Sequence, residues 1–151
     1  MISPFARKAI AGLSILACWG ASLALPAIES ETFGGTNITT GWTILLIGWL
    51  GPLMGHFGWF ANAMLIPALA IAAGQYGKAP RLKLVLGVIM LLLALNSAFW
   101  SYAPDDAGAH EIVSYLAGYW LWMASISATG LWLLIDAIRQ RTGPRGTKRA
   151  S

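Results

Sequence analysis

The sequence predicts an all-α integral membrane protein, a four-helix bundle with one additional non-crossing helix before the second span. Of the 151 residues, 57% are hydrophobic and only 11% are charged, which is unusual for a soluble domain. All ten Lys and Arg residues lie in three short stretches, 7–8, 78–83 and 139–149, and the long apolar segments lie between them. Basic residues that flank short loops stay in the cytoplasm, so we expect both termini on the cytoplasmic side.

Acidic residues mark the opposite side of the predicted membrane. They occupy the two gaps that contain no base, and only Asp136 lies near a basic stretch. The acids in the gaps are Glu29, Glu31, Asp105, Asp106 and Glu111. The net charge of +4 therefore reflects orientation and attraction to anionic headgroups. We expect the lipid bilayer as a partner, with its anionic headgroups near the basic tail, and no nucleic acid.

The first span is expected over residues 9–28, because about 20 residues cross a bilayer core of about 30 Å. Arg7 and Lys8 before an apolar run also suit a signal peptide, and residues 15–18 loosely resemble a lipoprotein cleavage box. Leu16 is too large for such a box, and the apolar run continues well beyond Cys18. We therefore expect a retained span.

The second apolar stretch, residues 41–74, would be about 50 Å long as one straight helix. Two crossings would place the bases of 78–83 outside, against the charge rule, so only one crossing is allowed. We assign it to residues 58–76, with a kink at Pro67. Residues 41–55 then form a non-crossing helix that lies at the outer interface or is re-entrant, with a break at Gly51-Pro52.

Two further spans are expected over residues 82–102 and 112–138. Pro80 precedes the first of these, and Pro104 follows it. Residues 1–138 thus form one transmembrane domain. Residues 139–151 form a basic cytoplasmic tail near the anionic surface of the membrane.

Glycines at positions 41, 48, 51, 55 and 58 have spacings of three, four and seven, which place them on one helical stripe. Trp42, Trp49 and His56 each follow one of these glycines by one residue. A smooth glycine strip allows close approach of another helix. It therefore serves either internal packing or a subunit interface, for which the candidate residues are Trp42, Gly48, Trp49, Gly51 and Gly55.

Polar side chains near the outer ends of the spans are candidates for ligand binding. His56 and Asn62 flank Trp59, and Asn96 lies deep in the third span. These groups would bind a headgroup or a small ring, or would serve as an interfacial anchor and a hydrogen bond between helices. Tyr119 and Trp122 in the fourth span fit either an aromatic belt or an aromatic ligand pocket.

The loop that contains Asp105, Asp106, His110 and Glu111 carries the ligand types of a divalent-cation site. Its spacing matches no known metal site, and a solvated turn explains the same residues. A lone cysteine, Cys18, excludes an internal disulfide. We predict no metal and no other cofactor.

Several short motifs together resemble those of a group of small, uncharacterised four-span bacterial inner-membrane proteins. The motifs lie at residues 22–27, 41–42, 48–51, 59–62 and 118–122. The resemblance covers most of the chain up to Leu134. Such relatives often have proline after the asparagine, where this chain has Ala63. The resemblance implies a bacterial inner membrane and carries over no activity.

The functional hypothesis is a non-enzymatic accessory or interaction subunit of a membrane assembly, packed on other subunits or on itself through the glycine strip and the fourth span. No acid or base is expected inside the spans, whereas ion transport needs such groups. Asp136 is expected to pair with Arg139 at the surface. The alternative is a lipid or small-molecule binder or transporter that uses His56, Asn62 and Asn96. No catalytic motif indicates an enzyme.

Overall fold

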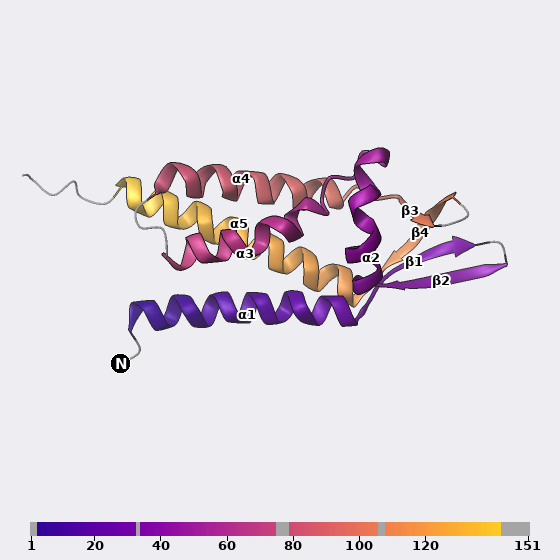
Figure 1. Ribbon diagram of the computed structural model, residues 1–151, viewed down its shortest axis with the longest axis horizontal. Helices are drawn as coiled ribbons and strands as arrows, with labels where there is room; N and C mark the ends of the chain where they lie inside the picture. Colours follow the sequence, from indigo (N-terminus) through magenta and orange to yellow (C-terminus); the bar gives the residue numbers. More distant parts are fainter. Residues whose placement is uncertain (1–2, 33, 75–78, 106–107, 143–151) are drawn as a thin grey trace, which may run out of the picture.

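A computed structural model describes residues 3–32, 34–74, 79–105 and 108–142. The long helices lie side by side along the long axis, and a small sheet extends from one end of this bundle (Figure 1). The elements are α1 (Pro4–Ala24), β1 (Pro26–Thr32), β2 (Gly35–Thr40), α2 (Gly41–Ile47), the 3-10 helix η1 (Gly48–Met54), α3 (Phe60–Ala73), α4 (Pro80–Ser97), β3 (Tyr102–Asp105), β4 (Gly108–Tyr115) and α5 (Ala117–Thr142).

The predicted all-α fold is wrong, because the protein is mixed α/β. Two hairpins, β1–β2 and β3–β4, join into one antiparallel sheet with the strand order β2-β1-β4-β3. One hairpin connects α1 to α2, and the other connects α4 to α5. Both therefore emerge at the same end of the bundle (Figure 1).

The strands take residues that were assigned to membrane spans. Helix α1 ends at Ala24, and Pro26 begins β1, so the span predicted over residues 9–28 is too long at its outer end. The span predicted over 112–138 begins inside β4, whose Ile112 and Val113 are β-branched. A short apolar run is compatible with either a strand or a helix, so the predicted spans included strand residues at the ends of the helices.

The number of spans is also corrected. In the described ranges, only α4 and α5 are long and apolar enough to cross a membrane by themselves. Helix α1 carries Arg7 and Lys8 in its first turns. Helix α3 has 14 residues, which gives about 21 Å, and Gly74 ends it with a left-handed φ of 99°. The expected kink residue Pro67 lies inside α3, and the span predicted over 58–76 reaches beyond the described residues.

Helix α2 and the 3-10 helix η1 together cover the segment expected as a non-crossing helix. In Figure 1 they lie across the end of the bundle, next to the base of the sheet. The side-chain hydroxyl of Thr40 caps the first turn of α2, and Pro52 lies inside η1. Gly55 ends η1 with a φ of 80°, a backbone conformation that favours glycine.

The apolar core lies between α3, α4 and α5, and α1 packs on it through Ile15, Leu16 and Trp19. Its fully buried members include Leu65 of α3 and Met90 of α4. The bundle is close-packed where α4 meets α5, because a Cβ on Gly87 would lie 2.9 Å from the carbonyl oxygen of Gly130. The core thus occupies the middle of the bundle, and the candidate site lies at the sheet end.

Candidate functional site

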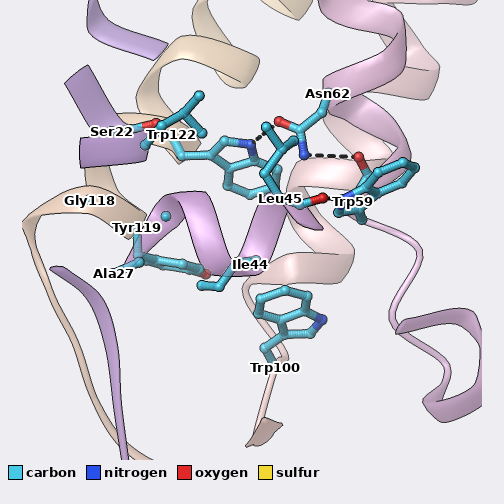
Figure 2. A pocket seen from close by; sticks show the side chains of 12 residues that line it. Ser22, Ala27, Ile44, Leu45, Trp59, Asn62, Trp100, Gly118, Tyr119 and Trp122 are labelled. Carbon is cyan, nitrogen blue, oxygen red and sulfur yellow. Dashed lines mark hydrogen bonds between the residues drawn. The ribbon is translucent and has the colours of Figure 1, made fainter. Parts of the chain in front are cut away.

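The candidate site is centred on the side chain of Asn62, near the start of α3. Its Oδ1 atom accepts hydrogen bonds from the indole Nε1 of Trp19 at 2.9 Å and from that of Trp122 at 2.8 Å. Its Nδ2 atom donates to the carbonyl oxygen of Trp59 at 3.0 Å (Figure 2). One amide thus connects α1, α3 and α5, and both acceptor positions of its oxygen are used.

Trp59 ties this centre to the helix that lies across the bundle. Its Nε1 atom donates to the carbonyl oxygen of Leu45 in α2 at 2.8 Å. Its ring lies against Gly48, where an added Cβ would overlap it. Gly51 is equally close to the following turn, since its Cβ would lie 2.6 Å from the carbonyl oxygen of His56. Gly48 and Gly51 therefore contact their own chain, which is the internal-packing alternative for the glycine strip.

A small apolar cavity of about 40 Å³ lies between these side chains. This volume holds a few water molecules at most and is well below that of a usual ligand pocket. Figure 2 shows the rings of Trp59, Trp100, Tyr119 and Trp122 around it. The remaining walls come from α1, β1, α2, α3 and α5, and they are Ser22, Leu23, Ala27, Gly41, Ile44, Leu45, Asn62 and Gly118.

Tyr119 and Trp122, predicted as belt or pocket residues, both line this cavity. The hydroxyl of Tyr119 donates to the carbonyl oxygen of Ser97 in α4 at 2.9 Å. Next to it, the hydroxyl of Tyr115 donates to the carbonyl oxygen of Trp100, and burial raises the pKa of Tyr115. The polar ends of these tyrosines hold α4 and the strand–helix junction together.

Trp100 was not singled out from the sequence, although it lines this cavity and a second one of about 30 Å³. Its Nε1 atom is buried and has no hydrogen-bond partner in the described part of the chain. Its ring meets that of His56 edge to face, with 5.5 Å between the ring centroids. The available signal in the sequence was a tryptophan shortly after the end of an apolar helix.

Asn96 does not contact Asn62, although a hydrogen bond between helices made the two natural partners. The Oδ1 atom of Asn96 accepts from the backbone amides of Phe57 at 2.7 Å and Gly58 at 3.2 Å. Its Nδ2 atom donates to the carbonyl oxygen of Gly55 at 3.2 Å. Asn96 thus fixes the loop between η1 and α3 on the end of α4.

His56 lies in that loop and lines the second cavity. Burial lowers the pKa of His56 below its ordinary value of 6.5, so the neutral imidazole is favoured at pH 7. His56 lies six residues before Asn62 in the sequence. In the structure they line different cavities.

Trp42 and Trp49 point out of the molecule and are 55% and 59% exposed. Leu46 of α2 and Leu53 of η1 are also exposed, and Leu53 is 84% exposed. We call Trp42, Leu46, Trp49 and Leu53 the outer stripe. It is the exposed side of the segment whose Gly48 and Gly51 are buried.

The candidate metal ligands fall on the hairpin β3–β4. Asp105 ends β3, and His110 and Glu111 lie in β4, whereas Asp106 lies outside the described residues. Glu111 pairs with Tyr102 and His110 with Ala103, so the register places Asp105 further along the hairpin, opposite Gly108. Within the described ranges, no three side chains of metal-ligand type come together.

An ion cluster at the opposite end of the bundle was missed. Asp136 of α5 pairs with Lys83 of α4, and its other oxygen lies 3.4 Å from the Nζ of Lys8 in α1. Gln140 also donates to Asp136, at 3.2 Å. Lys83 is only 1% exposed, contrary to the expectation that no base is buried within the helices. The sequence indicated this cluster only through Asp136, the one acid near the bases. The prediction paired Asp136 with Arg139 instead of Lys83 and Lys8.

Comparison with known proteins gives no match, either to a family model, to a curated protein or to a solved structure.

Proposed function

We propose that this chain is a non-enzymatic integral membrane protein, an accessory or interaction subunit that presents its sheet outside a bacterial inner membrane, with both termini in the cytoplasm. One observation carries the proposal: opposite charges lie at opposite ends of an apolar bundle. The described bases of α1, α4 and α5 lie at the end that holds the N-terminus (Figure 1). Glu29, Glu31 and Glu111 lie in the sheet at the other end.

Between the two ends, the outward faces of the helices are apolar. Leu13 of α1 is 66% exposed, and α4 and α5 expose similar side chains along their length. They include Leu82, Val85, Val88, Leu92 and Leu95 of α4, and Leu131, Ile135 and Ile138 of α5. Exposed leucine and isoleucine are costly in water and stable in lipid, so this band supports α4 and α5 as membrane-crossing helices.

The outer stripe supports the same orientation. It lies on a segment that runs across the bundle, at the boundary between the apolar band and the sheet (Figure 1). Tryptophan and leucine on such a segment suit the interface between acyl chains and headgroups. The basic end would face the anionic cytoplasmic leaflet.

An interaction role is favoured because the two asparagines that were the ligand-binding candidates already have partners within the chain. Asn62 and Asn96 would have to be free in a ligand binder that used them, yet each makes three hydrogen bonds. Gly48 and Gly51 of the glycine strip also pack on their own chain. The sheet is therefore the surface that is left for a partner protein.

The orientation is tested by cysteine labelling in cells. In a Cys18→Ser background, Thr36→Cys in the sheet and Arg141→Cys at the end of α5 are treated with a membrane-impermeant maleimide. We expect labelling of the first and protection of the second until the membrane is opened. Labelling of both, or of the second alone, would contradict the proposal.

The accessory role is tested by gentle detergent extraction and native mass spectrometry. We expect a complex of defined stoichiometry that contains this chain. A strictly monomeric protein without a stoichiometric companion would exclude an accessory role.

A further inference from the structure

The two edges of the sheet differ in a way that bears on partner binding. The strand order places β2 at one edge and β3 at the other. Strand β3 has four residues and contains Pro104, which has no amide proton, and Asp105. Short length, proline and charge are the features by which proteins protect a sheet edge against strand addition.

Strand β2 has none of these features. It has six residues, contains no charged residue and no proline, and includes four β-branched side chains, Thr36, Ile38, Thr39 and Thr40. Residues 35–38 are all exposed, and Ile38 is 56% exposed. Within the described residues, the strand partner of β2 is β1. No strand of the described ranges pairs with the other edge of β2.

The backbone of β2 can bind a further strand. In an antiparallel pair, every second residue directs its N–H and C=O groups away from its partner. Thr32 and Gly35 are the pair nearest the hairpin turn, and residues in this position normally form hydrogen bonds with each other. Because the direction alternates along the strand, the residues of β2 whose N–H and C=O groups point away from β1 are Thr36 and Ile38. These two residues offer a ladder to an added strand.

The charge next to this edge selects the added strand. Glu31 lies opposite Thr36 and Glu29 opposite Ile38, so all four side chains share one face. Ser114 donates to one oxygen of Glu29 at 3.0 Å, and Glu31 is exposed. An added strand lies two spacings of about 4.8 Å from β1, and a lysine or arginine on it can extend across the short Thr36 toward Glu31.

We propose that the open edge of β2 binds, by strand addition, an extended segment of a partner protein with basic residues at alternate positions. A second copy of this chain fits less well, because its own β2 contains no basic residue that could pair with Glu31. The inference rests on the proposed function for the exposure of the sheet outside the membrane. It adds the surface and the chemistry of the partner.

A peptide-binding experiment tests the edge directly. The full chain in lipid nanodiscs is titrated with a fluorescent nine-residue peptide of alternating lysine and valine, and with a peptide in which glutamate replaces lysine. We expect the lysine peptide to bind at least tenfold more tightly, with an affinity that falls as salt increases. Equal binding of the two peptides would overturn the charge selection.

Variants separate the two edges. Ile38→Lys places a charge on the open edge and should weaken binding at least tenfold, and Glu31→Gln should weaken it several-fold without changing the backbone. Tyr102→Lys makes the same kind of change on β3 and should leave the affinity unchanged. Circular dichroism checks that each variant is folded. If Tyr102→Lys weakens binding as much as Ile38→Lys, or if neither has an effect, the β2 site is excluded.

Photo-crosslinking in cells identifies the occupant. A photoreactive amino acid at position 37 should crosslink to an extended segment with alternating bases, and the same group at position 102 should not. Crosslinking to a second copy would replace the proposed partner by self-association. If Thr36→Cys is labelled from outside but crosslinking and peptide binding fail, this inference alone is wrong. If Thr36→Cys is protected, the proposed orientation is wrong whatever the peptide does.

Discussion

Gly87 of α4 and Gly130 of α5 lie backbone to backbone. A Cβ on Gly87 would lie 2.9 Å from the carbonyl oxygen of Gly130, and a Cβ on Gly130 would lie 3.1 Å from that of Gly87. Small residues at such a crossing let two helices of a membrane protein approach closely. The pair therefore sets the separation of the two helices that are able to cross a membrane.

Gly87→Ala and Gly130→Ala should each destabilise the protein. The added methyl forces α4 and α5 apart, at a cost of about 1–3 kcal/mol. The measurement is the midpoint of thermal unfolding in detergent. Gly20→Ala is the matched control, since a Cβ there meets no atom within 4 Å and alanine is the better helix former. A loss of stability in the control equal to that of the two variants would refute close packing as the cause.

Asn62→Leu should destabilise the sheet end of the bundle by about 2–4 kcal/mol. It leaves the indole N–H groups of Trp19 and Trp122 without an acceptor, and each unsatisfied buried donor costs about 1–3 kcal/mol. Denaturant unfolding measures the change. Adding Trp19→Phe and Trp122→Phe removes the orphaned donors, so the triple variant should recover part of the loss. Additive losses in the triple variant would show that the hydrogen bonds are not the source of the effect.

Asp136→Ala should cost about 3–5 kcal/mol, because it leaves the buried ammonium of Lys83 without its counter-charge. Combining Asp136→Leu with Lys83→Met removes both charges and should restore most of the stability. Arg139→Ala, on the same helix, should change the free energy of unfolding by less than about 0.5 kcal/mol. If Asp136→Ala were as mild as Arg139→Ala, the ion cluster would have no structural role.

Acid should destabilise the loop that contains His56. Burial lowers the pKa of His56 in the folded state, so the unfolded chain binds its proton at higher pH. The stability that depends on a neutral His56 is fully present above the pKa of the unfolded chain, about 6.5. It is lost as the pH falls through the lower pKa of the folded protein. Unfolding midpoints at pH 8 and pH 5 should differ more for the wild type than for His56→Gln. An identical pH dependence in the two proteins would contradict this assignment.

The sequence by itself determined the apolar character of the chain, the segregation of its charges and the existence of its main helices, because these depend on composition and on local order. It also singled out Asn62, Asn96 and Trp122, since polar and aromatic residues in apolar surroundings are conspicuous. Only the tertiary structure decided that residues 26–40 and 102–115 form a sheet. Strand pairing between β1 and β4 joins segments that are about 85 residues apart. It likewise decided that Asn62 bonds two tryptophans and that Lys83 pairs with Asp136. Each of these contacts depends on how distant helices pack, and a single sequence carries no local signal of that.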